Sequence, residues 1–308
     1  MTDGARTEDV RFQSAGLTLA GTFVVPEREG SAPAVLMLPG SGETDRDDNA
    51  KPLAIDVFPQ LSAAIVGLGM ATFRYDKRGV GASEGDYWTT GFDDRLTDAG
   101  SAVDWLRERP EVDSSRIVAL GHSEGALVSI RLAAGAAPVA GAILLAGSAR
   151  PGEQILTWQA RQIAATLTGF NRLVLRLLRI DVVKSQQKAF ARIRGTSEDV
   201  VRIQGRRINA RWMREFMAYD PAGDLARIEV PVLAITGDRD LQVDPGDLTR
   251  MHELVRGPFE ALRPPGLTHL LRTEGSRQGL GGYKEQVRRP VDPRVVSPIT
   301  EWLQQHFP

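Results

Sequence analysis

A serine that stands between two glycines is the feature of this sequence with the clearest chemical meaning. Residues 121–125 read Gly-His-Ser-Glu-Gly, which matches the Gly-x-Ser-x-Gly pattern of a nucleophile elbow. Glycines at the two outer positions permit a sharp turn that lifts the Ser123 hydroxyl out of the backbone. A β-forming run, residues 116–120, precedes the pattern, and a helix-forming run, residues 125–136, follows it. This strand–turn–helix context favours a nucleophilic Ser123 over a serine that merely opens a helix.

A serine hydroxyl attacks a carbonyl group only with the help of other groups. It requires a histidine to take its proton, a carboxylate to orient that histidine, and N–H donors for the developing oxyanion. After a nucleophile elbow the expected chain order is serine, acid, histidine. Asp240 follows the strand-like run 230–238, with Asp238 as the rival acid, and His269 follows the last strand-like run, 259–263. We therefore predict a triad of Ser123, His269 and Asp240, with a purely structural His269 as the alternative.

The other three histidines are poorer candidates for the base. One lies in a helical pattern, one lies at the chain end, and one is adjacent to the nucleophile with a side chain expected to project elsewhere; these are His252, His306 and His122.

Short apolar runs that alternate with amphipathic runs indicate the fold class. Residues 10–26 predict two antiparallel strands joined by a Ser-Ala-Gly turn. Further along the chain we expect buried strands at 32–40, 70–76, 116–120, 140–147, 230–238 and 259–263, helices at 56–69, 94–110, 125–136, 247–255 and 297–307, and a surface loop at 272–289. This alternation predicts an α/β fold with a mostly parallel, doubly wound sheet that is covered on both faces.

Residues 151–219 interrupt this alternation. The segment is helical in pattern and lacks a convincing strand, and between residues 154 and 214 it carries 13 Lys and Arg residues against three acids. We expect a helical cap at 151–219, inserted into a core domain formed by residues 1–150 and 220–308. The basic residues predict a solvated or ion-paired face. The alternative is that they bind an anionic acyl donor such as a CoA thioester, or a membrane surface.

Five short motifs together resemble the α/β-hydrolase superfamily of serine hydrolases. They are LPGSG at 38–42, YDKRGVGAS at 75–83, GHSEG at 121–125, GDRD at 237–240 and GLTH at 266–269. The loop 39–49 is most similar to that of bacterial carboxylesterases related to dienelactone hydrolases and serine peptidase-like hydrolases. The resemblance covers the chain from about residue 11 to its end. It implies an α/β-hydrolase fold, catalysis by the triad above, and an oxyanion hole formed by the backbone N–H groups of Ser41 and Glu124.

Two departures from the superfamily pattern bear on this oxyanion hole. Pro-Gly at 39–40 stands where His-Gly is common, and Glu124 places an acid beside the developing negative charge, so its carboxylate must point away. Nearby, we expect a structural ion pair between Asp76 and Arg78. Salt-bridge bracing is expected of Arg46 and its neighbouring acids, with a substrate-facing Arg46 as the alternative.

The composition narrows the classes of protein further. A net charge of −1 over 308 residues gives no indication of nucleic-acid binding. The absence of cysteine excludes disulfides, thiolate chemistry and cysteine-ligated zinc. The polar N-terminus lacks a signal-peptide pattern and no run of 18 apolar residues exists, so we expect a cytoplasmic location without membrane insertion. We expect no cofactor and no metal, and a homodimer is an open alternative to a monomer.

Together these features predict a serine hydrolase that cleaves carboxylic esters with short-to-medium acyl groups through an acyl-enzyme intermediate. Its small-molecule substrate is expected to contact Arg46 and apolar side chains of the cap, with Trp158, Phe170, Trp212 and Phe216 as candidates. The alternatives are an acyl-CoA thioesterase or acyltransferase, an aminopeptidase-like amide hydrolase and a non-catalytic binding protein. An aminopeptidase would need an acid to anchor the free amine, such as Glu124, Asp45 or Asp47.

Overall fold

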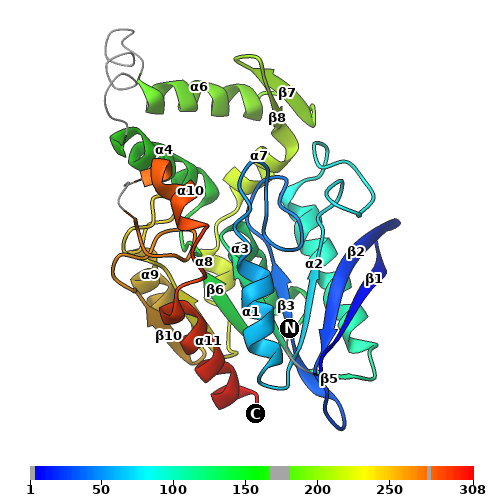
Figure 1. The fold of residues 1–308 in the computed structure, drawn as a ribbon. Coiled ribbons are helices and arrows are strands. Elements are labelled where there is room, and N and C mark those ends of the chain that lie inside the picture. Colours follow the sequence, from blue (N-terminus) through cyan, green and yellow to red (C-terminus); the bar gives the residue numbers. More distant parts are fainter. Residues whose placement is uncertain (1–3, 167–180, 276–278) are drawn as a thin grey trace.

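An eight-stranded sheet forms the centre of the molecule (Figure 1). The computed structural model describes residues 4–166, 181–275 and 279–308. The strands lie in the order β1-β2-β4-β3-β5-β6-β9-β10, in which β2 is antiparallel to both of its neighbours and the other pairs are parallel. Their bounds are β1 Arg6–Ser14, β2 Leu17–Val25, β3 Ala32–Leu38, β4 Ala71–Tyr75, β5 Val112–His122, β6 Gly141–Leu145, β9 Val232–Ile235 and β10 Phe259–Leu262. The predicted mostly parallel sheet is confirmed.

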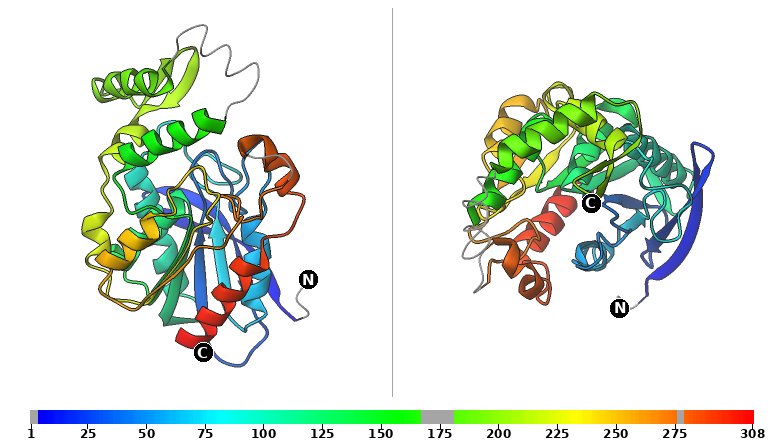
Figure 2. Two further views of the ribbon diagram at one scale, coloured as in Figure 1. Left: turned by 90° about the vertical axis from the view of Figure 1, so that its left-hand side faces the viewer. Right: turned by 90° about the horizontal axis from the view of Figure 1, so that it is seen from above.

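Helices cover both faces of this sheet, as the view from above shows (Figure 2). One face carries α1 (Val57–Val66) and α11 (Pro293–His306), and the other carries α2 (Phe92–Arg107), α3 (Glu124–Arg131), α8 (Ala222–Leu225) and α9 (Asp247–Leu254). A short π-helix, η1 (Leu132–Ala136), continues α3. Strands β3, β6 and β9 are buried along their whole length, which explains their continuous apolar sequences.

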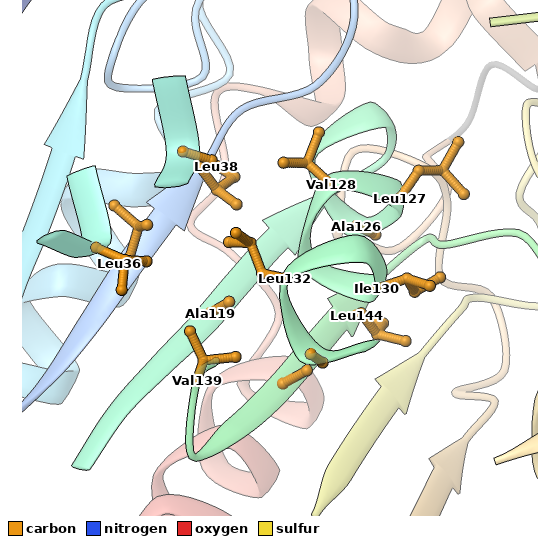
Figure 3. Packing of buried hydrophobic residues seen from close by; sticks show 14 of the residues in the cluster. Leu36, Leu38, Ala119, Ala126, Leu127, Val128, Ile130, Leu132, Val139 and Leu144 are labelled. Carbon is orange, nitrogen blue, oxygen red and sulfur yellow. The ribbon is translucent and has the colours of Figure 1, made fainter. Parts of the chain in front are cut away.

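The packing beneath α3 holds the helix that follows Ser123. Figure 3 shows Ala119 of β5, Ile130 of α3 and Leu144 of β6 in one apolar layer, and all three side chains are fully buried. Burying a side chain such as Ile130 contributes about 1.5–3 kcal/mol. Because α3 is fixed on the sheet, its first residue lies at a defined place above the ends of β3 and β5.

The segment between β6 and α8 forms a separate layer of elements at one end of the molecule, with the C-terminus at the other end (Figures 1 and 2). Its described elements are α4 (Gly152–Thr166), α6 (Val182–Arg194), β7 (Val200–Ile203), β8 (Arg206–Asn209) and α7 (Ala210–Ala218). A small apolar cluster of its own joins α6 to α7, formed by Phe190, Ile193, Ala210 and Met217. These elements occupy the range for which we predicted the cap.

The expectation that this segment contains no strand was wrong. Strands β7 and β8 form an antiparallel hairpin around a two-residue turn, Gln204-Gly205, in which both residues have positive φ. Such a turn matches the twist of paired strands. In the sequence, the arginines of this hairpin look like the charged face of a helix. For this reason the alternating apolar residues on the other side of the hairpin, Val201, Ile203 and Ile208, were not recognised as a strand pattern.

Two other boundaries differ from the sequence-based expectations. Part of the predicted surface loop at 272–289 is helical, with η2 (Gly279–Gly282) and α10 (Tyr283–Gln286), and Gln286 is fully buried. Helix α11 begins at Pro293, before the predicted start, because the Asp292 side chain accepts the Arg294 amide and proline suits the first helical position. Among the described residues, no helix is both long and apolar enough to cross a membrane.

Candidate active site

Ser123 lies in a strained turn between the end of β5 and the start of α3. Its backbone adopts φ 55° and ψ −113°, a conformation that non-glycine residues rarely adopt. A Cβ at Gly121 would lie 2.0 Å from the Gly125 carbonyl oxygen, and a Cβ at Gly125 would lie 1.9 Å from the Leu38 carbonyl oxygen. Only glycine therefore fits at both positions. The turn projects the serine hydroxyl at the carboxyl end of the sheet, as an elbow requires.

The structure brings the three predicted triad residues into one hydrogen-bonded chain. His269 Nε2 lies 3.1 Å from Ser123 Oγ, and His269 Nδ1 lies 2.8 Å from Asp240 Oδ2. The His269 and Asp240 side chains are buried, whereas Ser123 is partly exposed. In this arrangement the imidazole can take the serine proton while the carboxylate stabilises the imidazolium.

Asp240 holds its position through its second oxygen. Asp240 Oδ1 accepts the backbone N–H groups of Gln242 and Val243, at 2.7 and 2.9 Å. The rival acid, Asp238, faces elsewhere and accepts the Gly266 amide at 2.6 Å. The carboxylate that contacts His269 is therefore that of Asp240.

The loop after β3 passes directly beside Ser123. The position of a Cβ on Gly40 would lie 3.5 Å from the Cβ of Ser123, so Ser41 follows at the edge of the elbow and is exposed. Helix α3 begins at Glu124, and the first N–H groups of a helix lack partners within the helix. The backbone amides predicted for the oxyanion hole thus belong to two segments that meet at Ser123.

A buried lysine that sequence reasoning missed fastens this loop. The Lys77 ammonium donates to the carbonyl oxygens of Gly40 and of Gly42, the latter at 3.3 Å, and pairs with Glu124 Oε1 at 3.0 Å. Burial lowers the pKa of Lys77, although the nearby charge of Glu124 opposes this effect. The position of Lys77 just after β4, in the YDKRGVGAS stretch, was the only hint in the sequence that it lies near the site. The direction of its side chain depends on the tertiary structure.

Both oxygens of the Glu124 carboxylate have side-chain partners. Besides Lys77, it accepts a hydrogen bond from the Trp212 indole at 2.7 Å, and Arg95 Nε lies 3.9 Å from it. These three partners hold the acid between the core and helix α7. That this carboxylate faces away from a developing oxyanion stays a prediction, and its engagement with Lys77 and Trp212 is compatible with it.

The candidate substrate-binding residues are scattered. Trp212 bonds Glu124, the residue after Ser123, and its ring stacks on Phe216 with centroids 4.7 Å apart. Phe216 is buried and packs edge-on against Phe92, whereas Trp158 lies on α4 in a hollow with Arg150 and Arg161. Phe170 lies outside the described residues.

The charged residues of the neighbouring loops pair differently from the sequence-based expectation. Arg46 binds Asp76 at 2.7 Å, which places its guanidinium in a bracing contact. The expected ion pair between Asp76 and Arg78 was wrong, because Arg78 instead pairs with Asp98 at 2.7 Å and with Asp94 at 3.1 Å. Asp76 thus pairs with a residue of the loop after β3, and Arg78 pairs with two acids of helix α2.

No group of three or more His, Asp or Glu side chains that could hold a metal ion occurs within residues 4–166, 181–275 and 279–308. A cavity of about 860 Å³ lies beside the loop after β3, lined by Gly42, Glu43 and Gly81 among others.

The fold and the elbow define the class: this is an α/β-hydrolase fold. A solved esterase of Butyrivibrio proteoclasticus with bound ferulic acid has a TM-score of 0.64 and 17% identity, over 96% of this chain and 98% of that one. An esterase of Pyrococcus furiosus also gives a TM-score of 0.64, with 18% identity over 97% of this chain and 91% of that one. At these identities the likeness concerns the fold.

Sequence comparison identifies the family. The family described as "Serine aminopeptidase, S33" matches residues 54–275, and the chain belongs to it. Esterase EstD of Thermotoga maritima is 28% identical over 288 residues, which are 92% of this chain and 65% of that protein. An uncharacterized protein of Mycobacterium tuberculosis is 34% identical over 125 residues, which are 41% of this chain and 40% of that protein. The chain thus matches less than two thirds of the length of either relative.

Proposed function

We propose that this protein hydrolyses carboxylic esters with short-to-medium acyl groups through an acyl-enzyme on Ser123. The observation that carries the proposal is the hydrogen-bonded chain from Ser123 Oγ to His269 at 3.1 Å and on to Asp240 at 2.8 Å. It occurs at a strained elbow beside backbone N–H groups, which is the full set of groups that acyl transfer needs. The similarity to an esterase of Thermotoga maritima supports the same class of reaction.

The reaction proceeds in two halves. Ser123 Oγ attacks the ester carbonyl while His269 Nε2 takes the hydroxyl proton, and the Ser41 and Glu124 amides donate to the oxyanion. His269 then returns the proton to the departing alkoxide, which leaves as an alcohol and leaves an ester on Ser123. A water molecule, deprotonated by His269, attacks this ester and releases the carboxylic acid and the free serine.

The family name makes amide hydrolysis the second candidate function. The partners of the acids around the site argue against an aminopeptidase. An aminopeptidase needs a free carboxylate for the substrate ammonium group. Glu124 is engaged with Lys77 and Trp212, Asp45 accepts two amides of its own loop, and Asp47 pairs with Arg74 at 2.7 Å. All three candidate anchors are thus already occupied.

A matched panel of substrates tests the proposal. Purified protein is assayed with p-nitrophenyl butyrate, butyryl-CoA and an aminoacyl p-nitroanilide, alongside the Ser123→Ala variant. We expect the highest kcat/KM for the ester and a loss of at least about 10³-fold in Ser123→Ala. A preference for the thioester would favour the thioesterase alternative, and preference for the anilide would favour the aminopeptidase. Full activity of Ser123→Ala would exclude the triad.

A further inference from the structure

A second acid–histidine pair lies directly behind the predicted triad. His122 is the last residue of β5, precedes the nucleophile and is only 2% exposed. Its Nδ1 lies 2.6 Å from Asp48 Oδ2, and its Nε2 lies 3.0 Å from the backbone carbonyl oxygen of His269. The His122 and His269 rings are 5.0 Å apart. His122 therefore contacts the proposed base without contacting the nucleophile's hydroxyl.

The partners of His122 fix the number of protons on the pair. A carbonyl oxygen can only accept, so His122 Nε2 must carry hydrogen to bond His269. The bond between Nδ1 and Asp48 needs a second hydrogen, either on the imidazole or on the carboxyl group. Asp48 Oδ1 accepts the Gly40 amide at 2.7 Å. The negative charge of Asp48 also interacts electrostatically with the cations Lys77 and Arg272. Burial opposes a charged imidazole, but the charge and hydrogen bond of Asp48 raise the pKa of His122, which favours a doubly protonated His122.

The same pair connects two parts of the proposed catalytic machinery. Asp48 holds the Gly40 amide, immediately before Ser41 in the oxyanion loop, and His122 holds the backbone of His269. Asp48 itself has a left-handed backbone, with φ 65°, so a local strain is maintained to place its carboxylate there. One buried ion pair thus fixes the loop on one side of Ser123 and the base on the other.

We propose that Asp48 and the imidazolium of His122 form a positioning pair that sets the distance between the oxyanion loop and His269. The proposal rests on the proposed function, because the distance matters only if these groups catalyse acyl transfer. Neither residue touches the substrate. Misplacing reacting groups by about 1 Å can cost about 10²-fold in rate, so a pair that fixes both groups affects kcat more than KM.

The charges around His122 give the proposal a pH dependence. Burial alone would lower the pKa of His122, but the charge and hydrogen bond of Asp48, the His269 carbonyl and the charge of Asp240 together raise it. When the pH rises through this raised pKa, the pair loses a proton and the bond to His269 or to Asp48 is lost. The pair therefore predicts an alkaline decline in kcat.

Two variants separate positioning from simple stability. His122→Phe keeps a ring but removes both bonds, and we expect kcat for p-nitrophenyl butyrate to fall about 10- to 100-fold with KM changed less than about 3-fold. Asp48→Asn suits the left-handed backbone and can donate to a neutral His122, whose Nε2–H still reaches His269. We expect a smaller loss of kcat and no alkaline decline, because no proton is left to lose.

A spectroscopic measurement tests the pair independently of activity. In the ¹⁵N-histidine-labelled protein, we expect both His122 nitrogens to carry hydrogen at pH 6.5 and to lose one hydrogen only in the range of the alkaline decline, whereas in Asp48→Asn only one nitrogen carries hydrogen at pH 6.5. Glu260→Gln is the matched control, because it alters the exposed contact of His306 with Glu260, 3.4 Å long. If the native protein hydrolyses none of the substrates, the proposed function fails, but the ¹⁵N spectrum still tests the pair. A singly protonated His122, or normal kcat and pH profile in both variants, would overturn the positioning role.

Discussion

The ion pair between Lys77 and Glu124 gives a quantitative test of how the site is built. The two side chains are 4% and 3% exposed and their charged atoms are 3.0 Å apart. Glu124→Gln keeps the shape and the backbone amide of residue 124 but leaves the Lys77 ammonium buried without its counter-charge. Removing one partner of a buried pair costs about 3–5 kcal/mol, because the remaining charge has lost its compensation.

The expected change in melting temperature follows from chain length. Unfolding entropy is about 2.1 cal/mol/K per residue, so a chain of 308 residues has about 0.65 kcal/mol/K. A loss of 3–5 kcal/mol then lowers Tm by about 5–8 °C. Asp104→Asn is the control, since the Arg107–Asp104 contact is on the surface with Asp104 69% exposed, and its Tm should barely move.

A double-mutant cycle shows whether the two charges interact. Lys77→Met, Glu124→Gln and the combined variant are unfolded by heat and by urea, and their free energies of unfolding are compared. We expect the combined variant to lose at least about 1 kcal/mol less than the sum of the two single losses, because it contains no orphaned charge from this pair. Losses that add to within about 0.5 kcal/mol would refute the reasoning.

Three further predictions concern the elbow, the acid and the second histidine. Gly125→Ala should lower stability by at least about 3 kcal/mol, measured by urea unfolding, because the new Cβ would meet a β3 carbonyl oxygen at 1.9 Å; a stable, fully active variant would contradict the turn geometry. Asp240→Asn should lower kcat about 10⁴-fold and Asp238→Asn far less, by steady-state kinetics with p-nitrophenyl butyrate, and the reverse order would assign the acid to Asp238. Because the pKa of His122 is raised above 6.5 in the folded protein, its contribution to stability is complete below that pH and declines as pH rises through the raised value. The free energy of unfolding should therefore fall on the alkaline side, and a flat profile would show that His122 does not hold the proton.

Much of the fold could be predicted from local sequence pattern. Continuous apolar runs such as 32–38 give buried parallel strands, and helical spacing gives the helices between them, so the mostly parallel sheet was predicted correctly. Chain order after the elbow singled out Asp240 and His269, and the structure places His269 against Ser123 and Asp240 against His269. Their role in catalysis remains a prediction for the experiments above.

The parts that sequence reasoning missed depend on where individual side chains point. The loop after β3 carries several acids, and only the tertiary structure shows that Asp48, with a backbone φ of 65°, is the one whose carboxylate contacts His122. Lys77 follows β4 and reaches carbonyl oxygens of the loop after β3, and Asp76 pairs with Arg46 of the same loop. These side-chain partners are determined by packing between distant segments, which leaves no periodic pattern in the sequence.

Covalent labelling of the nucleophile tests the central claim most directly. The protein is treated with a fluorophosphonate, and the adduct is located by mass spectrometry of its peptides. We predict a single adduct on Ser123, absent in Ser123→Ala and strongly slowed in His269→Ala, because the serine is reactive only when His269 takes its proton. Ester hydrolysis by a protein whose Ser123 stays unlabelled, or equally fast labelling without His269, would contradict the account.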